Sequence, residues 1–142
     1  MIAKLHYEVK VRYERIDDAG KAKKVTEVYI VSTLESQDVE ITILSELSSY
    51  RDVEILSIKK VKIDQVIAVY NRERHREKWY RARCAVINLD DNDRPRRTSI
   101  SVIINADDFD DADNRLHAWL DAMTSDIELL SLSLSSIKGW LI

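Results

Sequence analysis

The sequence predicts an α+β fold built from two tandem ββαβ units, because it repeats itself and both copies show the same order of strand and helix patterns. Compared with itself at an offset of 73 residues, the chain aligns Tyr7 with Tyr80 and continues without a gap to residue 47. After one inserted residue, residues 52–58 align with residues 126–132. A head-to-tail repeat of this kind predicts two copies of one supersecondary unit, related by a pseudo-twofold axis.

Each copy is expected to begin with a β-hairpin. Residues 6–16 alternate between apolar and charged side chains, which is typical of a half-buried strand. Residues 17–21 form a turn cluster with two aspartates and a glycine, and residues 25–31 are rich in β-branched residues that favour a second strand. The second copy repeats the pattern, with strands at 79–89 and 98–104 around a polar turn at 90–96.

A helix and a third strand complete each unit. In the first copy, residues 36–48 carry apolar side chains at helical spacing, and their first turn is acidic, which complements the helix dipole. In the second copy the apolar stripe runs from Phe109 to Met123 after an acidic start. The third strands are expected at 53–61 and 127–135, with residues 63–70 and 137–142 extending or bending them.

The domain organisation follows from length and from the junction between the copies. A chain of 142 residues is the size of one domain. We therefore expect a single compact domain over residues 1–142, built from a first repeat at 1–71 and a second at 78–142. The apolar faces of two such units are most simply buried against each other in a shared core. Whether the strands form one sheet or two stays open.

Composition indicates a soluble protein of a reducing compartment, and we expect it to be cytoplasmic. No run of 18 apolar residues is present, and the N-terminus enters an alternating pattern at once, which indicates neither a membrane span nor a signal peptide. Cys84 is the lone cysteine, so no disulfide can form within one chain. The net charge of −3 argues against a surface that is positive throughout and binds any nucleic acid.

No pattern points to catalysis, and we expect a protein that is not an enzyme and needs no metal or cofactor. An enzyme or a binder of a small nucleotide stays open as a third class of function, because the fold alone does not decide function. With two glycines the chain can hardly build a phosphate-binding loop, and its three histidines lack the paired spacing of a zinc site. The acidic run at 107–113 does not match a calcium loop and is better explained as the start of a helix. The acidic turn at 90–93 is likewise better explained as hairpin chemistry.

The densest cluster of positive charge surrounds the start of the second copy and encloses Trp79. If strand alternation holds, Tyr80, Ala82, Cys84 and Val86 face the core, while Trp79 lies outward beside two arginines. Basic side chains neutralise phosphates and aromatic rings stack on unpaired bases, so this strand is a candidate platform for single-stranded DNA or RNA. The candidate binding residues are Arg74, Arg76, Lys78, Trp79, Arg81, Arg83, Arg94, Arg96 and Arg97, with Lys10 and Arg12 on the matching outward face of the first copy.

Two other interpretations of this charge remain. Lys- and Arg-rich strands and hairpin tips are often solvated, or pair with acidic residues on a neighbouring strand. The protein would otherwise be a homo-oligomer or a structural component of a phage particle whose sheet edges pair with neighbours, with Trp140 as an apolar anchor.

Several segments resemble a known family. The segments at 10–14, 24–31, 39–40 and 57–60, and a strand followed by a charged hairpin and a short helix in the second half, resemble an uncharacterised family of small proteins. Its members are about as long as this chain and occur in gut-type bacteria and their phages. The resemblance covers nearly the whole chain and implies a bacterial or phage origin and the same fold. It implies no catalytic residue, because the family is a domain of unknown function.

Overall fold

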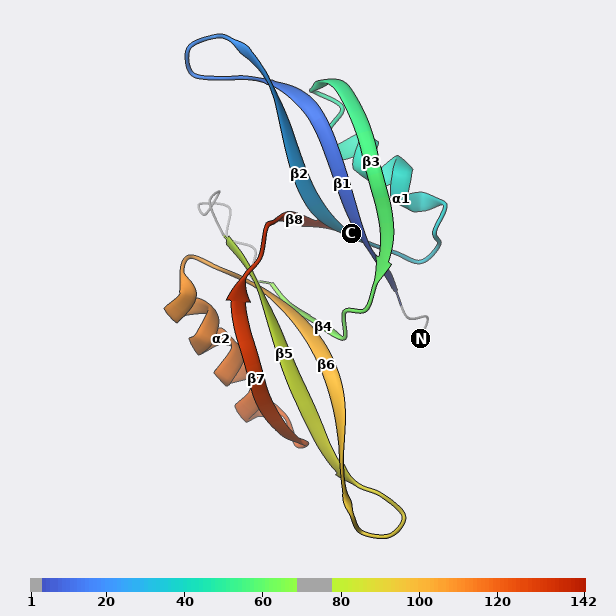
Figure 1. Ribbon diagram of the computed structural model, residues 1–142, viewed down its shortest axis with the longest axis vertical. Coiled ribbons are helices and arrows are strands. Elements are labelled where there is room, and N and C mark those ends of the chain that lie inside the picture. The colour runs from blue at the N-terminus through green and yellow to red at the C-terminus, as the bar shows by residue number, and fades with distance from the viewer. Residues whose placement is uncertain (1–3, 69–77) are drawn as a thin grey trace. The chain divides into compact units, whose positions relative to one another are not determined.

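The computed structural model describes residues 4–68 and 78–142 (Figure 1). Two compact units make up the chain. Unit 1 comprises Met1–Lys62 with Ser136–Ile142, and unit 2 comprises Ile63–Ser135. Each unit has a four-stranded, mostly antiparallel sheet and one helix, which confirms the α+β class and gives two sheets rather than one. That the units share one core within a single compact domain stays a prediction.

Unit 1 contains a hairpin, a helix, a third strand and a strand from the far end of the chain. Its sheet has the order β3-β1-β2-β8, with all neighbours antiparallel except β2 and β8, which are parallel. The elements are β1 (Leu5–Ile16), β2 (Ala22–Thr33), α1 (Asp38–Glu46), β3 (Arg51–Val61) and β8 (Ile137–Leu141).

Unit 2 repeats this arrangement with a short parallel strand at the same place. Its sheet has the order β4-β6-β5-β7, and β4 is parallel to β6. The elements are β4 (Gln65–Ile67), β5 (Lys78–Leu89), β6 (Pro95–Ala106), α2 (Phe109–Ala122) and β7 (Asp126–Leu134).

The alternation predicted from sequence places the core of each unit between its sheet and its helix. In β1, Tyr7, Val9, Val11 and Tyr13 are buried in one cluster with residues of α1, including Ile43. In unit 2, Ala82 and Cys84 of β5 form a cluster with residues of β6 and with Leu116 of α2. Side chains two residues apart lie on the same face of a strand, and side chains four residues apart lie on the same face of a helix. In these clusters the apolar face of the sheet packs against the apolar face of the helix.

The short strands β4 and β8 correct the sequence prediction. Residues 63–70 and 137–142 were expected to extend or bend the third strands, but they form separate strands: β4 pairs with β6 in unit 2, and β8 pairs with β2 in unit 1. Residues 69 and 70 lie outside the described part of the chain. The physical reason is that the second strand of each hairpin, β2 or β6, has an edge that its hairpin partner does not cover. The main-chain groups along that edge need hydrogen-bond partners, and a short apolar segment supplies them. Periodicity shows that such a segment is a strand but does not name its partner.

The hairpin turns at 17–21 and 90–94 have the same hydrogen bonds. The Asp17 carboxylate accepts from the main-chain N–H groups of Ala19 (3.0 Å) and Lys21 (2.9 Å). The Asp90 carboxylate, 73 residues later, accepts from Asn92 (2.8 Å) and Arg94 (2.9 Å) in the same way. The left-handed position of each turn is Gly20 (φ 78°) in the first and Asp93 (φ 58°) in the second. These aspartates therefore act as turn formers.

The helices have one further property in common. Within residues 4–68 and 78–142, neither is long and apolar enough to cross a membrane.

Candidate nucleic-acid interface

The predicted basic residues lie on three strands and one turn. Lys78, Arg81 and Arg83 are in β5, Arg96 and Arg97 are in β6, Arg94 is in the turn between them, and Lys10 and Arg12 are in β1. Arg74 and Arg76 lie outside the described residues. Strands β5 and β6 are paired along their whole length, so the structure brings the β5 and β6 arginines onto one hairpin of unit 2.

The prediction that the Trp79 side chain is exposed is wrong. Alternation does place Trp79 on the face of β5 that carries Arg81 and Arg83, opposite the helix, but its side chain is only 7% exposed. Its carbonyl accepts the main-chain N–H of Ser135 (2.8 Å), which holds this end of the strand in the sheet. A base cannot stack on a ring that solvent does not reach. Alternation fixes the face on which a residue lies, but not whether that part of the face is open.

Arg83 is exposed on this outer face and has a serine opposite it on each neighbouring strand. It pairs with Ser101 on β6 and with Ser131 on β7. Two positions away on the same face, Arg81 pairs with Ser133 on β7. Sequence analysis missed these serines, although the alternation of serine with apolar residues at 99–101 and 131–133 was a signal. We define the arginine–serine face as Arg81, Arg83, Ser99, Ser101, Ser131 and Ser133.

The charges around this face leave Arg83 uncompensated. Within the described ranges Arg83 makes no ion pair, and no acidic residue is opposite it on either neighbouring strand. Two carboxylates of the described residues lie near this face and both have partners: Glu128, opposite Ala85, is paired with Arg97 at 3.0 Å. Asp64 accepts the main-chain N–H of Ser101 at 2.8 Å. The serine hydroxyls add hydrogen-bond donors without adding charge.

Two of the other predicted arginines form ion pairs with acidic residues on a neighbouring strand. This is the arrangement that the alternative interpretation of the basic residues predicts. The guanidinium of Arg12 lies 2.7 Å from the carboxylate of Glu54 on β3, and that of Arg97 lies 3.0 Å from Glu128 on β7. Both pairs are solvent-exposed and contribute little stability. They nevertheless reduce the positive charge that Arg12 and Arg97 present to a ligand.

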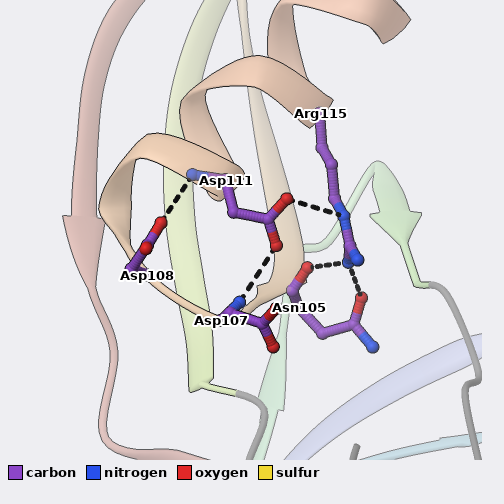
Figure 2. A network of polar contacts seen from close by, with 5 residues as sticks. All are labelled: Asn105, Asp107, Asp108, Asp111 and Arg115. Carbon is purple, nitrogen blue, oxygen red and sulfur yellow. Dashed lines mark hydrogen bonds and ion pairs between the residues drawn. The ribbon is translucent and has the colours of Figure 1, made fainter.

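The acidic residues before α2 belong to a network that fixes the start of that helix (Figure 2). The Asp108 carboxylate caps the helix by accepting the Asp111 N–H (2.8 Å), and the Asp111 carboxylate accepts the Asp107 N–H (3.0 Å). Arg115 lies 3.6 Å from the Asp111 carboxylate and donates to the carbonyl of Asn105 and to its side-chain oxygen (2.9 Å). The acidic run is thus used in capping, as the helix interpretation requires.

Metal ligation has no visible basis in the described part of the chain, where no group of three or more His, Cys, Asp or Glu side chains is placed to hold an ion. The thiol of Cys84 is fully buried, and this burial raises its pKa. A buried protonated thiol packs as a small apolar group rather than as a nucleophile.

Comparison with known proteins gives one match. The model of a family described as a domain of unknown function, DUF4494, matches residues 5–140. Comparison with curated proteins and with solved structures gives no match. Because the match spans nearly all of the 142 residues, the chain belongs to the DUF4494 family.

Proposed function

We propose that this protein is a non-enzymatic interaction module that binds single-stranded nucleic acid through its phosphate backbone, at the arginine–serine face of unit 2. The observation that carries the proposal is the environment of Arg83: exposed, without an acidic partner in the described residues, and with a serine opposite it on both sides. Guanidinium groups bind phosphate oxygens in a bidentate manner, and serine hydroxyls are common phosphate donors.

The burial of Trp79 changes the expected mode of binding. Without an exposed ring on this face, affinity depends on charge and hydrogen bonds to the backbone, so we expect little base preference and a strong dependence on salt. Lys78, Arg94 and Arg96 are exposed on the same hairpin and supply further positive charge at the ends of β5 and β6.

A salt titration of fluorescence anisotropy tests the proposal, with a labelled single-stranded DNA and an RNA of the same sequence. We expect binding at low salt, and Arg83→Gln should weaken it about tenfold and reduce the slope of log K against log[salt] by about 1, as expected for one lost phosphate contact. Lys60→Gln, on β3 of unit 1, is the matched control because it removes one exposed positive charge elsewhere. No binding of either strand at low salt, or equal losses in both variants, would contradict the proposal.

We also propose that the chain arose by tandem duplication. The β1–β2 and β5–β6 registers support it, because Tyr7 pairs with Val31 and Tyr80 pairs with Ile104, at the same offset of 73 residues. The irregularity between Lys10 and Val11 in β1 recurs between Arg83 and Cys84 in β5. An experimental structure in which residues 6–62 and 79–135 do not superimpose strand for strand would contradict this proposal. The predicted pseudo-twofold axis would be tested by the same structure.

A second candidate function is self-association through β7, as a homo-oligomer or a phage-particle component. Strand β7 is at the edge of its sheet, carries no charged residue after Glu128, and exposes Leu130 (48%) and Leu134 (62%). Edge strands without charge readily pair with another chain. Light scattering after size-exclusion chromatography should show an oligomer that Leu134→Lys dissociates; a monomer at all concentrations would exclude this function.

A further inference from the structure

Unit 1 contains a pocket that neither the repeat nor the basic strand accounts for. It has a volume of about 560 Å³ and lies where the last residues of β1 meet the start of β2 and the segment that joins α1 to β3. This volume lies within the range of about 300–1,000 Å³ that is usual for small-molecule sites. Its walls include Arg15, Ile16, Tyr50 and Arg51.

Positive charge predominates in this pocket. Arg15 and Arg51 are both exposed, and within the described residues neither makes an ion pair. The acidic side chain in the lining is Glu14, which is opposite Arg51 in the β1–β3 register. Asp17 and Asp18 line a neighbouring pocket with Arg15 and Lys23 rather than this one, and one oxygen of the Asp17 carboxylate accepts both N–H groups of the hairpin turn. Two guanidinium groups against one carboxylate favour an anion.

The aromatic residue Tyr50 lines the pocket, and its ring is held in place by a contact with another tyrosine. The Tyr50 side chain is 40% exposed, and its ring centroid lies 4.4 Å from that of Tyr13 at an interplanar angle of 41°. Tyr13 is 2% exposed and donates its hydroxyl to the Glu27 carboxylate (2.7 Å), which also accepts from Tyr29 (3.0 Å). A ring supported in this way offers a preorganised surface on which a planar group can stack.

The backbone beside the pocket is strained. Asp52, directly after Arg51, has a φ of 54°, in the left-handed region that favours glycine. Asp52 lies at the β-bulge between the Arg12–Glu54 and Glu14–Arg51 pairs, and aspartate is among the residues that tolerate this conformation, so the bulge accounts for the positive φ. Asp126, which aligns with Asp52 in the second copy, is not among the described residues with positive φ.

The chemistry of the pocket is specific to unit 1. In the alignment of the two copies, Arg15 corresponds to Asn88, and the pair Tyr50-Arg51 corresponds to Thr124-Ser125. The second copy therefore keeps neither the two arginines nor the aromatic ring.

We propose that this pocket binds a nucleoside phosphate, with the phosphate held by Arg15 and Arg51 and the base stacked on Tyr50. The exposed side chain of Ile16 provides apolar surface near the ring, and Glu14 can accept hydrogen bonds from sugar hydroxyls or base amino groups. A free nucleotide and the terminal nucleotide of a strand present the same chemistry. The site lies in unit 1, so it does not depend on the arginine–serine face of unit 2.

Isothermal titration calorimetry with the four ribonucleoside 5′-monophosphates tests this site. We expect binding of at least one of them, with a dissociation constant of about 1 mM or tighter. The double variant Arg15→Gln, Arg51→Gln should weaken binding at least tenfold, because it removes both charge-assisted contacts to the phosphate. Lys59→Gln with Lys60→Gln, two exposed residues near the other end of β3 and outside both proposed sites, removes the same charge and should leave the affinity unchanged.

Further ligands and variants separate the parts of the proposed site. The parent nucleoside and inorganic phosphate should each bind more weakly than the nucleotide, and Tyr50→Leu should weaken nucleotide binding while Tyr50→Phe retains it. A 5′-phosphorylated oligonucleotide that competes with the nucleotide, when its 5′-hydroxyl form does not, identifies a strand end as the source. The absence of binding by every monophosphate, or an equal loss in the Lys59/Lys60 control, would overturn the proposal.

Discussion

The indole N–H of Trp140 donates to the hydroxyl of Ser32, which lies 108 residues earlier in the chain, over a distance of 2.7 Å. Ser32 is 2% exposed, and its hydroxyl also lies 2.6 Å from Nδ1 of His6. The buried hydroxyl has partners on both β1 and β8, so this contact ties the end of the described chain to the sheet of unit 1. It gives Trp140 a contact within the fold, and the expectation that Trp140 anchors a partner stays a prediction.

We expect Trp140→Phe to lower the free energy of unfolding by about 1 kcal/mol, because it removes one buried hydrogen bond while keeping an aromatic ring. Urea denaturation followed by circular dichroism measures the change. Trp119→Phe is the control, since the Trp119 indole makes no hydrogen bond in the described residues. In a double-mutant cycle, Ser32→Ala and Trp140→Phe should be non-additive. Additive losses would mean that the contact does not stabilise the protein.

The Arg115 network should be a main support of α2. Replacing Arg115 by methionine keeps much of the aliphatic stem but leaves Asn105, which is 4% exposed, without these donors. The expected loss is about 1–3 kcal/mol of unfolding free energy, the usual effect of removing charge-assisted hydrogen bonds from a buried polar group. The midpoint of urea denaturation measures it. Arg94→Met, at an exposed turn, should have little effect, and an unchanged midpoint for Arg115→Met would show that solvent replaces the network.

Alkaline pH should destabilise unit 1 through Tyr13 and Tyr29. Burial, with the neighbouring Glu27 carboxylate adding to it, raises the pKa of both phenols above the ordinary value of 10.0. A raised folded-state pKa contributes stability that is complete below pH 10 and is lost progressively above it, because the unfolded chain ionises first. Urea midpoints measured across this range should fall, and they should fall less in Tyr13→Phe. Equal pH dependence in the variant and the parent would count against this assignment.

Cys84 should report on the opening of unit 2. Its side chain is fully buried, and burial raises its pKa, so both access and ionisation oppose reaction. We expect a disulfide reagent to modify the folded protein at least on the order of 100-fold more slowly than the urea-unfolded protein, at a rate set by local opening. Fast labelling without denaturant would show that this core is open. Ala82→Val, which crowds the same face of β5, should change the rate.

The sequence predicted those parts of the fold that depend on local periodicity. The alternation from Tyr7 to Tyr13 predicted the buried face of β1, and the stripe that includes Leu116 predicted the helix that covers the second sheet. These predictions succeed because side-chain direction repeats every two residues in a strand and every 3.6 in a helix. The partners of β4 and β8 could not be predicted in this way, since pairing depends on which sheet edge is open.

The candidate sites were predictable only in part. The basic strand β5 was visible in the sequence, but the serines beside Arg83 and the burial of Trp79 depend on pairing with β6 and β7 and on tertiary packing. The pocket near Tyr50 was missed because its residues come from three segments, none of which has a recognisable motif. A signal was nevertheless present: the second copy replaces each arginine and the ring by small or uncharged residues.

The reciprocal placement of β4 and β8 has a consequence for any nick in the chain between residues 68 and 78. The N-terminal fragment would contain β4, which pairs with Val102–Ile104 of the C-terminal fragment. The C-terminal fragment would contain β8, which pairs with Val28–Val31 of the N-terminal fragment. Neither product could leave with a complete sheet. A protease acting at that junction should therefore yield two pieces that co-migrate under native conditions and separate only on denaturation.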